Sequence, residues 1–358
     1  MKKIAILSAV NIKHMSLITL YTDILKQHDI QYDIIYMDKY NEDEYFECEN
    51  KYRYVNKINP KGNKIYKMVK YCLFYPYATK IMRANKYDFI IVWNDVAIFM
   101  FADFLSRVYK GRYCLNVRDN MGYEKKSRKK RFEKVFKNSA FNTISSEGYL
   151  DFLPKGIKYI PINSLNLSIL QGMTKHQSLK KGNQPIVIGF IGYVRFFERN
   201  KKMLDVFSND DRFELHYYGS KANELKKYAE EHNINNTCFH DSFPVNETKK
   251  YLEKIDIINN LYGNDTINLQ KAISIKFFHA LYANIPILVC ENTFVGKEAI
   301  NVGIGFEVTD INEKMKDDLF NWYSKLNFEK IKLNCNDYLE EKIEQNKTFE
   351  KIALNHFK

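Results

Sequence analysis

The sequence contains no run of about 18 consecutive apolar residues, which excludes a hydrophobic transmembrane helix. Its first residues, MKKIAILSAV, begin like a signal peptide. However, Asn11, Lys13 and His14 soon interrupt the apolar stretch, and no small-residue cleavage site follows. We therefore interpret this segment as the first strand of the fold, and we expect a cytoplasmic protein.

Metal and cofactor motifs are also absent. The six cysteines lie far apart and form no C-x-x-C pair, which argues against a zinc site and suits a reducing compartment. The nicotinamide fingerprint G-x-G-x-x-G is missing from both halves, since Gly189 and Gly192 give only G-x-x-G. A nicotinamide-dependent dehydrogenase would explain one doubly wound domain, but it would require this fingerprint.

Positive charge, in contrast, is in excess. The chain has 55 Lys and Arg against 43 Asp and Glu, a net charge of +12. This excess implies an anionic partner, which could be nucleic acid, a membrane surface or a phosphorylated substrate. No nucleic-acid-binding motif is present, so we expect no nucleic-acid partner. The length of 358 residues predicts two domains, and the hydrophobic content of 45% excludes wholesale disorder.

Strand-like apolar runs alternate with helical patterns in both halves of the chain, which is typical of parallel, doubly wound sheets. A polar segment at residues 179–185, LKKGNQP, separates the halves and is the expected linker. We therefore predict an α/β fold of two Rossmann-like domains, residues 1–181 and 182–340, facing a cleft. Pro76 is expected to interrupt the helical pattern of residues 61–84. Strands are expected at residues 3–10, 32–37, 89–93, 113–117, 141–145, 158–162, 186–191, 213–218, 237–240, 255–261, 285–290 and 305–308.

Residues 186–202, IVIGFIGYVRFFERNKK, join a buried strand to a cluster of cations. Gly192 stands at the carboxyl end of the strand, where the backbone must turn or approach a ligand closely. In open α/β sheets, ligands bind at this edge. The cations there suit an anionic ligand, most simply a phosphate, although an ordinary basic helix start is the alternative. The cations are Arg195, Arg199, Lys201 and Lys202.

An ordered series of motifs extends over nearly the whole chain. GFIGYVR, HYYGS, FHDSFP, IDIINNLY, SIKFFHALYANIPILV and GIGFEV follow one another in the second half, and FIIVWND, LNVRDN, NTISSEG and IPINSLN in the first. In order and spacing they resemble the GT-B glycosyltransferases, and among them the family-four-like enzymes that build bacterial capsular and cell-surface polysaccharides. The resemblance implies that the first half binds the acceptor and the second half the nucleotide-sugar donor. It also implies that residues 341–358 form a helix that packs back on the first domain.

The resemblance assigns donor-binding roles to several residues. In the family, a basic pair after the first donor-domain strand holds the diphosphate, which here implies Arg195 with either Lys201 or Lys202. A later helix contacts the ribose, often through Glu, but this sequence has His279 at that place. A neutral imidazole makes one hydrogen bond there and does not clamp two hydroxyls; alternatively, His279 is a satisfied histidine on a helix face. The full set of expected donor-binding residues is Gly192, Arg195, Gly219, Lys276, Phe277 and His279.

The resemblance implies transfer of a sugar from a UDP-linked donor to a saccharide or lipid-linked saccharide, with retention of configuration. The departing nucleoside diphosphate gains negative charge, which fixed cations stabilise in the transition state. We expect no cofactor and no metal, since no D-x-D triplet is present and Asp210-Asp211 precedes a strand. The alternatives are a catalytically degenerate binding or scaffold subunit, which His279 favours, and the oxidoreductase considered above.

Polar side chains follow two buried strands of the first half. Asn94 and Asp95 come after one strand, and Arg118 and Asp119 after the next. We expect them at the acceptor side of the cleft, where Asp95 or Asp119 could orient the acceptor hydroxyl. Helix capping is the alternative reading, and it suits Asp95 better than Asp119. His14, after the first strand, could also face the cleft.

The most basic stretch of the chain runs from Lys125 to Lys137. It holds eight Lys or Arg and one Glu, a net charge of +7. A solvated helix face would explain it, but so many like charges also predict a partner. Residues 66–77, YKMVKYCLFYPY, mix lysines with aromatic side chains, which suits a bilayer interface. Together they predict peripheral docking on the anionic inner face of the cell membrane.

Overall fold

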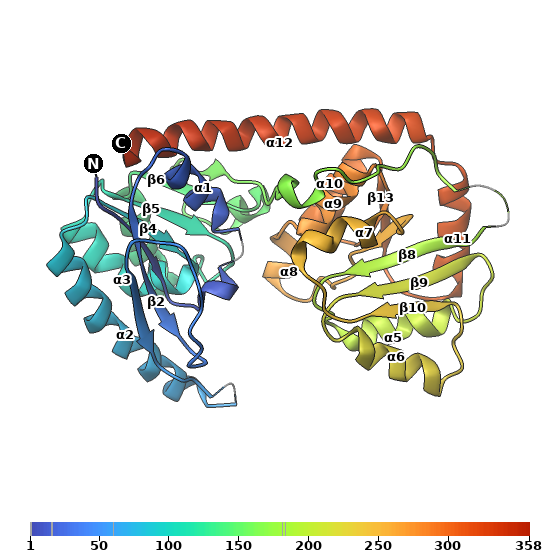
Figure 1. The fold of residues 1–358 in the computed structure, drawn as a ribbon, viewed down its shortest axis with the longest axis horizontal. Helices are drawn as coiled ribbons and strands as arrows, with labels where there is room; N and C mark the ends of the chain where they lie inside the picture. Colours follow the sequence, from blue (N-terminus) through green and yellow to red (C-terminus); the bar gives the residue numbers. More distant parts are fainter. Residues whose placement is uncertain (1, 16, 60, 181, 183) are drawn as a thin grey trace. The chain divides into compact units, whose positions relative to one another are not determined.

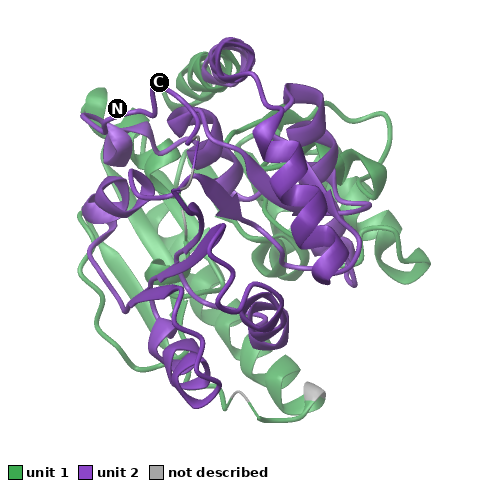
Figure 2. Ribbon diagram, turned by 90° about the vertical axis from the view of Figure 1, so that its right-hand side faces the viewer, with its two compact units in different colours: residues 1–163, 344–358 green, residues 164–343 purple. Residues whose placement is uncertain are grey.

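The computed structural model describes residues 2–15, 17–59, 61–180, 182 and 184–358. It divides the chain into two compact units, shown in Figure 2: residues 1–163 with 344–358, and residues 164–343. Each unit contains one parallel sheet with helices, so the expected pair of α/β domains is confirmed. None of the described helices is both long enough and apolar enough to cross a bilayer.

The sheet of the first unit has the order β3-β2-β1-β4-β5-β6-β7, and all its neighbouring strands are parallel (Figure 1). Continuous apolar runs such as FIIVW form its central strands, which are buried on both faces. Its strands are β1 (Ile4–Ser8), β2 (Tyr32–Asp38), β3 (Lys51–Val55), β4 (Phe89–Trp93), β5 (Tyr113–Val117), β6 (Phe141–Ile144) and β7 (Ile160–Pro161). Its helices are α1 (Thr19–Gln27), α2 (Lys64–Asn85), α3 (Asp95–Val108), α4 (Lys126–Lys137) and the carboxyl-terminal half of α12 (Phe328–Phe357).

The sheet of the second unit has the order β10-β9-β8-β11-β12-β13, again with parallel neighbours. Because β8 and β11 are adjacent, the loops after these two strands meet at the same edge. The strands are β8 (Ile186–Ile191), β9 (Phe213–Tyr218), β10 (Thr237–His240), β11 (Ile257–Asn259), β12 (Ile287–Cys290) and β13 (Gly305–Val308). The helices are α5 (Phe197–Val206), α6 (Ala222–Glu231), α7 (Thr248–Leu252), α8 (Ile267–Lys271), α9 (Ile275–Ala283), α10 (Phe294–Val302) and α11 (Glu313–Ser324).

The final helix, α12, contributes to the core of the first unit. Phe349, Ala353 and Phe357 are buried there, and the Phe349 ring meets the Tyr21 ring edge-on with their centroids 4.9 Å apart. Residues 344–358 therefore belong to the first unit, although they are last in the sequence.

The change from the first unit to the second comes earlier than the linker suggests. The expected boundary falls at Lys181, which lies outside the described residues. The structure instead divides the chain between Asn163 and Ser164. The reason is that Leu165, Leu170 and Leu179 are buried in the core of the second unit, so the segment before the polar linker already packs with it.

Pro76 does not interrupt its helix, contrary to the sequence-based expectation. Helix α2 runs unbroken from Lys64 to Asn85. Pro76 is exposed, so the carbonyl group that loses its hydrogen bond is on the solvent side and can be hydrated. Thr79 Oγ1 also donates to the carbonyl of Tyr75 at 2.9 Å, which ties the turn around the proline together.

Candidate functional site

At the carboxyl edge of the second sheet, the loops after β8 and β9 approach each other closely, each at a glycine. Gly192 follows β8 with a φ of 112°, and Gly219 follows β9 with a φ of 136°. A Cβ atom on Gly219 would lie 2.1 Å from the carbonyl oxygen of Gly192, a distance that no side chain tolerates. Both positions therefore require glycine. This close approach leaves the backbone of Gly192 open toward the ammonium of Lys276, whose Nζ lies 4.0 Å from the place of a Gly192 Cβ.

Lys276 brings a buried positive charge to this edge. It lies in the first turn of α9, where the Ser274 side chain caps the helix by accepting from the Lys276 amide at 3.1 Å. Its side chain is only 3% exposed. The ammonium donates to the Tyr262 hydroxyl and lies 4.2 Å from the centroid of the Phe190 ring. Within the described residues it has no carboxylate partner, although burying an unpaired charge is costly.

His279 lies one turn further along the same helix. It is 7% exposed, and neither ring nitrogen has a hydrogen-bond partner among the described residues. Burial, together with the nearby charge of Lys276, lowers the pKa of His279 to about 4. The imidazole is therefore neutral near pH 7. It is not a satisfied histidine, as the alternative interpretation expected, because both of its ring nitrogens lack a partner among the described residues.

This pKa predicts an acid-sensitive fold. The unfolded chain takes up a proton on His279 below about pH 6.5, whereas the folded chain does so only near pH 4. Between these values the unfolded state holds more protons, so acid favours unfolding, and the stability present above pH 6.5 is lost as the pH falls. We expect this residue to contribute up to about 3 kcal/mol of that loss. Urea unfolding of the wild type and of His279→Phe across this range should show a flatter pH dependence in the variant; equal slopes would contradict the assignment.

A second cation, Arg199, reaches the same edge from α5. Its Nε and Nη2 atoms lie 3.2 Å from the place of a Cβ on Gly263, in the loop after β11. The Gly263 amide donates to Cys290 Sγ at 3.2 Å, so the guanidinium stands beside the end of β12 as well. Arg199 is half-buried and forms no ion pair within the described residues.

A cavity of about 130 Å³ lies next to these groups, lined by Tyr262, which contacts Lys276, and by Gly263, which lies beside Arg199. It is bordered by the ends of β11 and β12 and by the amino-terminal ends of α9 and α10, whose helix dipoles favour an anion. Asn260, which is 3% exposed, lines it, and its Oδ1 accepts no hydrogen bond from any described residue. The lining residues are Asn260, Tyr262, Gly263, Leu269, Ala272, Ile273, Ser274, Cys290, Thr293 and Val295.

The other expected donor residues lie away from this cavity. Arg195 is exposed, with its guanidinium 5.7 Å from the centre of the Tyr193 ring. Lys201 is ion-paired with Glu198 at 3.1 Å, and Lys202 with Asp310 at 2.6 Å. Phe277 is fully buried in the core, with its ring centroid 5.5 Å from that of Tyr338.

Arg199 was expected only as one of the four cations that follow the strand at residues 186–191, and it was not in the set of donor-binding residues. Tyr262 was in neither set. A signal for Arg199 existed, because it lies four residues before the buried Met203 and thus shares the inward face of α5. Tyr262 lies in a loop and carried no such signal.

At the carboxyl edge of the first sheet, Asn94 and not Asp95 caps the amino-terminal end of helix α3. The Asn94 side chain accepts from the Ala97 amide at 2.9 Å. Asp95 is instead buried, where it accepts from the Tyr123 hydroxyl and, at 3.0 Å, from the Asp119 amide. Burial raises the pKa of Asp95 to about 7. This carboxyl group therefore braces the loop after β5 and is already occupied by protein donors.

The remaining residues expected on the acceptor side are more accessible. Asp119 is exposed, and the half-buried Arg118 holds its guanidinium 5.8 Å from the centre of the Trp93 ring. Exposed His14 lies 3.1 Å from the Tyr40 hydroxyl through Nε2. Partial loss of hydration, together with the charges of Lys13 and Lys39, lowers its pKa. Of the two carboxylates expected to orient the acceptor, Asp119 is therefore the one exposed to solvent.

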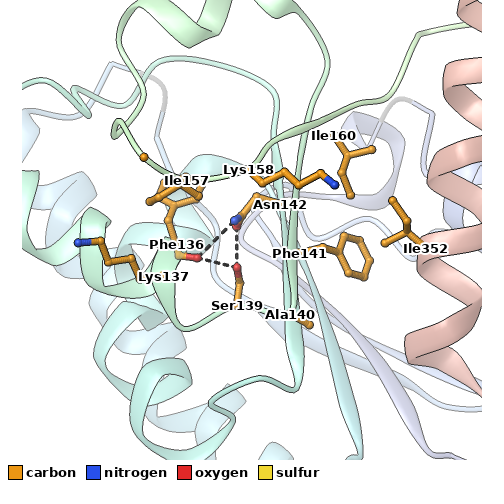
Figure 3. A pocket seen from close by; sticks show the side chains of 11 residues that line it. Phe136, Lys137, Ser139, Ala140, Phe141, Asn142, Ile157, Lys158, Ile160 and Ile352 are labelled. Atoms are coloured by element: carbon orange, nitrogen blue, oxygen red, sulfur yellow. Dashed lines mark hydrogen bonds between the residues drawn. The ribbon is translucent and has the colours of Figure 1, made fainter.

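A larger hollow, of about 440 Å³, lies at the opposite end of the first sheet (Figure 3). It is lined from the amino ends of β6 and β7, by residues that include Lys137, Phe141 and Lys158, together with Ile352 of α12. Figure 3 shows the Phe141 ring directed toward Ile352, with Ser139 and Asn142 hydrogen-bonded to each other. Ligands of open α/β sheets bind at the carboxyl edge, so this hollow is not the candidate site.

Comparison with solved structures finds the same fold in proteins of low sequence identity. Sucrose-phosphate synthase from Thermosynechococcus elongatus is 13% identical, with a TM-score of 0.64 over 99% of this chain and 97% of that one. WaaG, a glycosyltransferase involved in lipopolysaccharide biosynthesis, is 10% identical, with a TM-score of 0.62 over 98% and 99%. HepE from Anabaena, solved in complex with UDP, is 10% identical, with a TM-score of 0.64 over 99% and 100%.

These likenesses establish the fold, two parallel-sheet α/β units of the GT-B type. No model of a protein family matches the chain, and no curated protein matches its sequence.

Proposed function

We propose that this protein is a glycosyltransferase that moves a sugar from a UDP-linked donor to a saccharide or lipid-linked saccharide during synthesis of a bacterial surface polysaccharide. The observation that carries the proposal is the buried ammonium of Lys276, which has no carboxylate partner among the described residues and lies beside a cavity at the carboxyl edge of the second sheet. A diphosphate would supply the missing negative charge. The neighbouring Arg199 would supply a planar donor for the same group.

The residues at this edge support transfer chemistry. When the bond to the sugar breaks, negative charge grows on the departing diphosphate, and the fixed cations Lys276 and Arg199 stabilise it more in the transition state than in the ground state. Asn260 Oδ1 can accept from a donor hydroxyl, since it has no partner among the described residues. We infer that no metal or cofactor takes part and that configuration is retained, as the resemblance to the family-four-like enzymes implies.

The first unit would then bind the acceptor. Asp119 is the better candidate for orienting the acceptor hydroxyl, because Asp95 is buried and accepts hydrogen bonds from Tyr123 and Asp119. Arg118 offers a half-buried cation at the same edge.

A thermal-shift panel of nucleoside diphosphates and their sugars tests the proposal. A ligand present at about 100 times its dissociation constant adds about 2.7 kcal/mol of stability by mass action. We expect stabilisation by UDP and by one or more UDP-sugars. If no nucleoside diphosphate stabilises the chain, the donor site is refuted.

The unusual His279 favours one second candidate, a degenerate subunit that binds the nucleotide-sugar without transferring the sugar. A direct assay of nucleotide-sugar hydrolysis separates the two. An enzyme releases UDP from the stabilising nucleotide-sugar. A binding subunit leaves it intact.

We further propose that α4 attracts the protein to the inner face of the cell membrane. Phe132, Val135 and Phe136 are its buried face, so its charges point outward. Some of these charges are neutralised, because Arg131 and Lys134 both contact Asp103 of α3, at 3.3 and 3.4 Å. Lys126, Lys130 and Lys137 are exposed and form no ion pair within the described part of the chain.

We therefore expect a variant with Lys126, Lys130 and Lys137 changed to Gln to bind anionic vesicles about 100-fold more weakly at low salt, at about 1 kcal/mol per basic residue. Sedimentation with vesicles measures this. Changing Lys227, Lys297 and Lys314, three exposed lysines of the second unit, to Gln is the matched control for lost charge. Equal losses in both variants would show that net charge alone, and not α4, is responsible.

A further inference from the structure

Helix α2 exposes a continuous apolar face to solvent. Ile65, Met68, Val69 and Leu73 are 69%, 59%, 51% and 49% exposed. Cys72 and Pro76 are exposed as well. The six residues follow the spacing i, i+3, i+4, i+7, i+8 and i+11, so they lie along one side of the helix. We call this set the α2 stripe.

The stripe is not needed to hold α2 in place. The helix packs on the first unit through a different face, where Phe74, Ala78 and Met82 are fully buried. The Phe74 ring meets the Phe101 ring of α3 edge-on, with their centroids 5.8 Å apart, and Figure 1 shows the two helices side by side. A surface helix that is already anchored usually places polar residues on its outer side.

Exposed large apolar side chains lie closer together along the chain in the α2 stripe than anywhere else in the described residues. Four of them fall within residues 65–73, whereas outside the stripe no nine-residue window of the described chain holds more than two. Isolated exposed apolar residues are normal, but a contiguous group marks a contact surface.

The charges around the stripe indicate the chemistry of the surface that it would contact. Helix α2 contains five Lys or Arg and not one Asp or Glu. Lys57 and Lys61, just before it, are exposed cations. A partner must therefore offer an apolar interior beneath a negatively charged surface, which is the layered chemistry of an anionic lipid bilayer.

We propose that the α2 stripe inserts into the boundary between headgroups and acyl chains of an anionic membrane, with the helix lying in the plane of the surface. The lysines around it keep their ammonium groups among the phosphates, while their alkyl stems lie along the apolar layer. The proposal rests on the peripheral membrane location proposed above and names the element that inserts. Because apolar insertion is not screened by ions, it predicts a component of binding that survives high salt, unlike the attraction of α4.

Flotation of the full chain with vesicles of phosphatidylglycerol and phosphatidylcholine tests this. At about 1 M salt, where the Debye length is about 3 Å, we expect the wild type to retain part of its binding. A variant with Met68→Gln, Val69→Gln and Leu73→Gln should lose that part, at least about tenfold, because interfacial binding scales with buried apolar area. The three positions are exposed and Gln is a good helix former, so the fold should survive. The matched control changes Val108, Leu150 and Leu333, which are exposed elsewhere, to Gln.

The exposed Cys72 provides a direct probe of insertion. A nitrobenzoxadiazole dye on Cys72, in a chain carrying Cys48→Ser and Cys238→Ser, should shift to the blue on vesicles and become protected from iodide. The same dye on the exposed Cys238, with Cys48 and Cys72 changed to Ser, should stay in water.

Four results would overturn the proposal. The first is a stripe variant that binds at high salt as the wild type does. The second is a Cys72 dye that remains aqueous on bound protein. The third is a chain that binds no vesicle at all. The fourth is a wild-type dimer in solution that the stripe variant dissociates, which would assign the face to a second copy. Stabilisation of the stripe variant by UDP should be unchanged, so failure of insertion is distinguishable from failure of sugar transfer.

Discussion

Replacing Lys276 by Met should lower turnover of the nucleotide-sugar by about 100-fold or more, as loss of a fixed charge contact in the transition state does. The same change should leave the free energy of unfolding equal or higher. The ammonium is buried between the Phe190 and Tyr262 rings and has no carboxylate partner in the described chain, so the folded ligand-free protein gains little from its charge. Met fills a similar volume with no charge to desolvate.

A matched control exists in the same unit. Lys316 is also buried, at 8% exposure, but it forms ion pairs with Asp210 at 3.2 Å and Glu313 at 2.6 Å. Lys316→Met should therefore destabilise the fold by leaving Asp210 without one of its cations, while UDP affinity stays unchanged. Urea unfolding and steady-state kinetics on both variants give the comparison. If Lys276→Met destabilises the fold and leaves turnover intact, Lys276 is a structural residue and the donor site is elsewhere.

Strands with continuous apolar runs could be predicted from the sequence. Residues 89–93 and 186–191 form β4 and β8 with the expected bounds, because both faces of such a strand are covered and every position favours an apolar side chain. Strand β3, KYRYV, was missed. It lies at the edge of its sheet, is only partly buried, and therefore carries Lys51 and Arg53, whose charges hide the strand pattern.

The edge that carries the candidate site could also be predicted, since a parallel sheet brings its loops together wherever the strands end. Gly192 and Lys276 do lie close to each other there. The inward or outward direction of each cation could not be predicted, because it depends on partners that are distant in sequence. Lys202, for example, pairs with Asp310, which is 108 positions away. The sequence shows four cations after one strand. It does not show which of them form ion pairs with carboxylates that are distant in sequence.

The cations around β8 and α5 provide the second large effect. We expect Arg199→Ala to lower kcat/KM for the donor by about 100-fold, because its guanidinium lies beside Gly263 at the cavity and is half-buried without an ion pair in the described residues. Arg199→Lys should recover only part of the loss, since an ammonium cannot reproduce the two parallel hydrogen bonds of a guanidinium to phosphate.

The neighbouring residues serve as matched controls on the same segment. Lys201→Ala and Lys202→Ala should each change kcat/KM by less than about threefold, because their ammonium groups already form exposed ion pairs, with Glu198 and Asp310, and such pairs contribute little. Arg195→Ala decides between the two assignments, since the resemblance implies a diphosphate contact at Arg195, whereas the position of Arg199 beside the cavity favours a contact there. Steady-state kinetics and UDP titration on the four alanine variants measure all of these effects. If Arg195→Ala loses activity while Arg199→Ala keeps it, the contact belongs to the exposed loop after β8, and Arg199 only packs against the turn at Gly263.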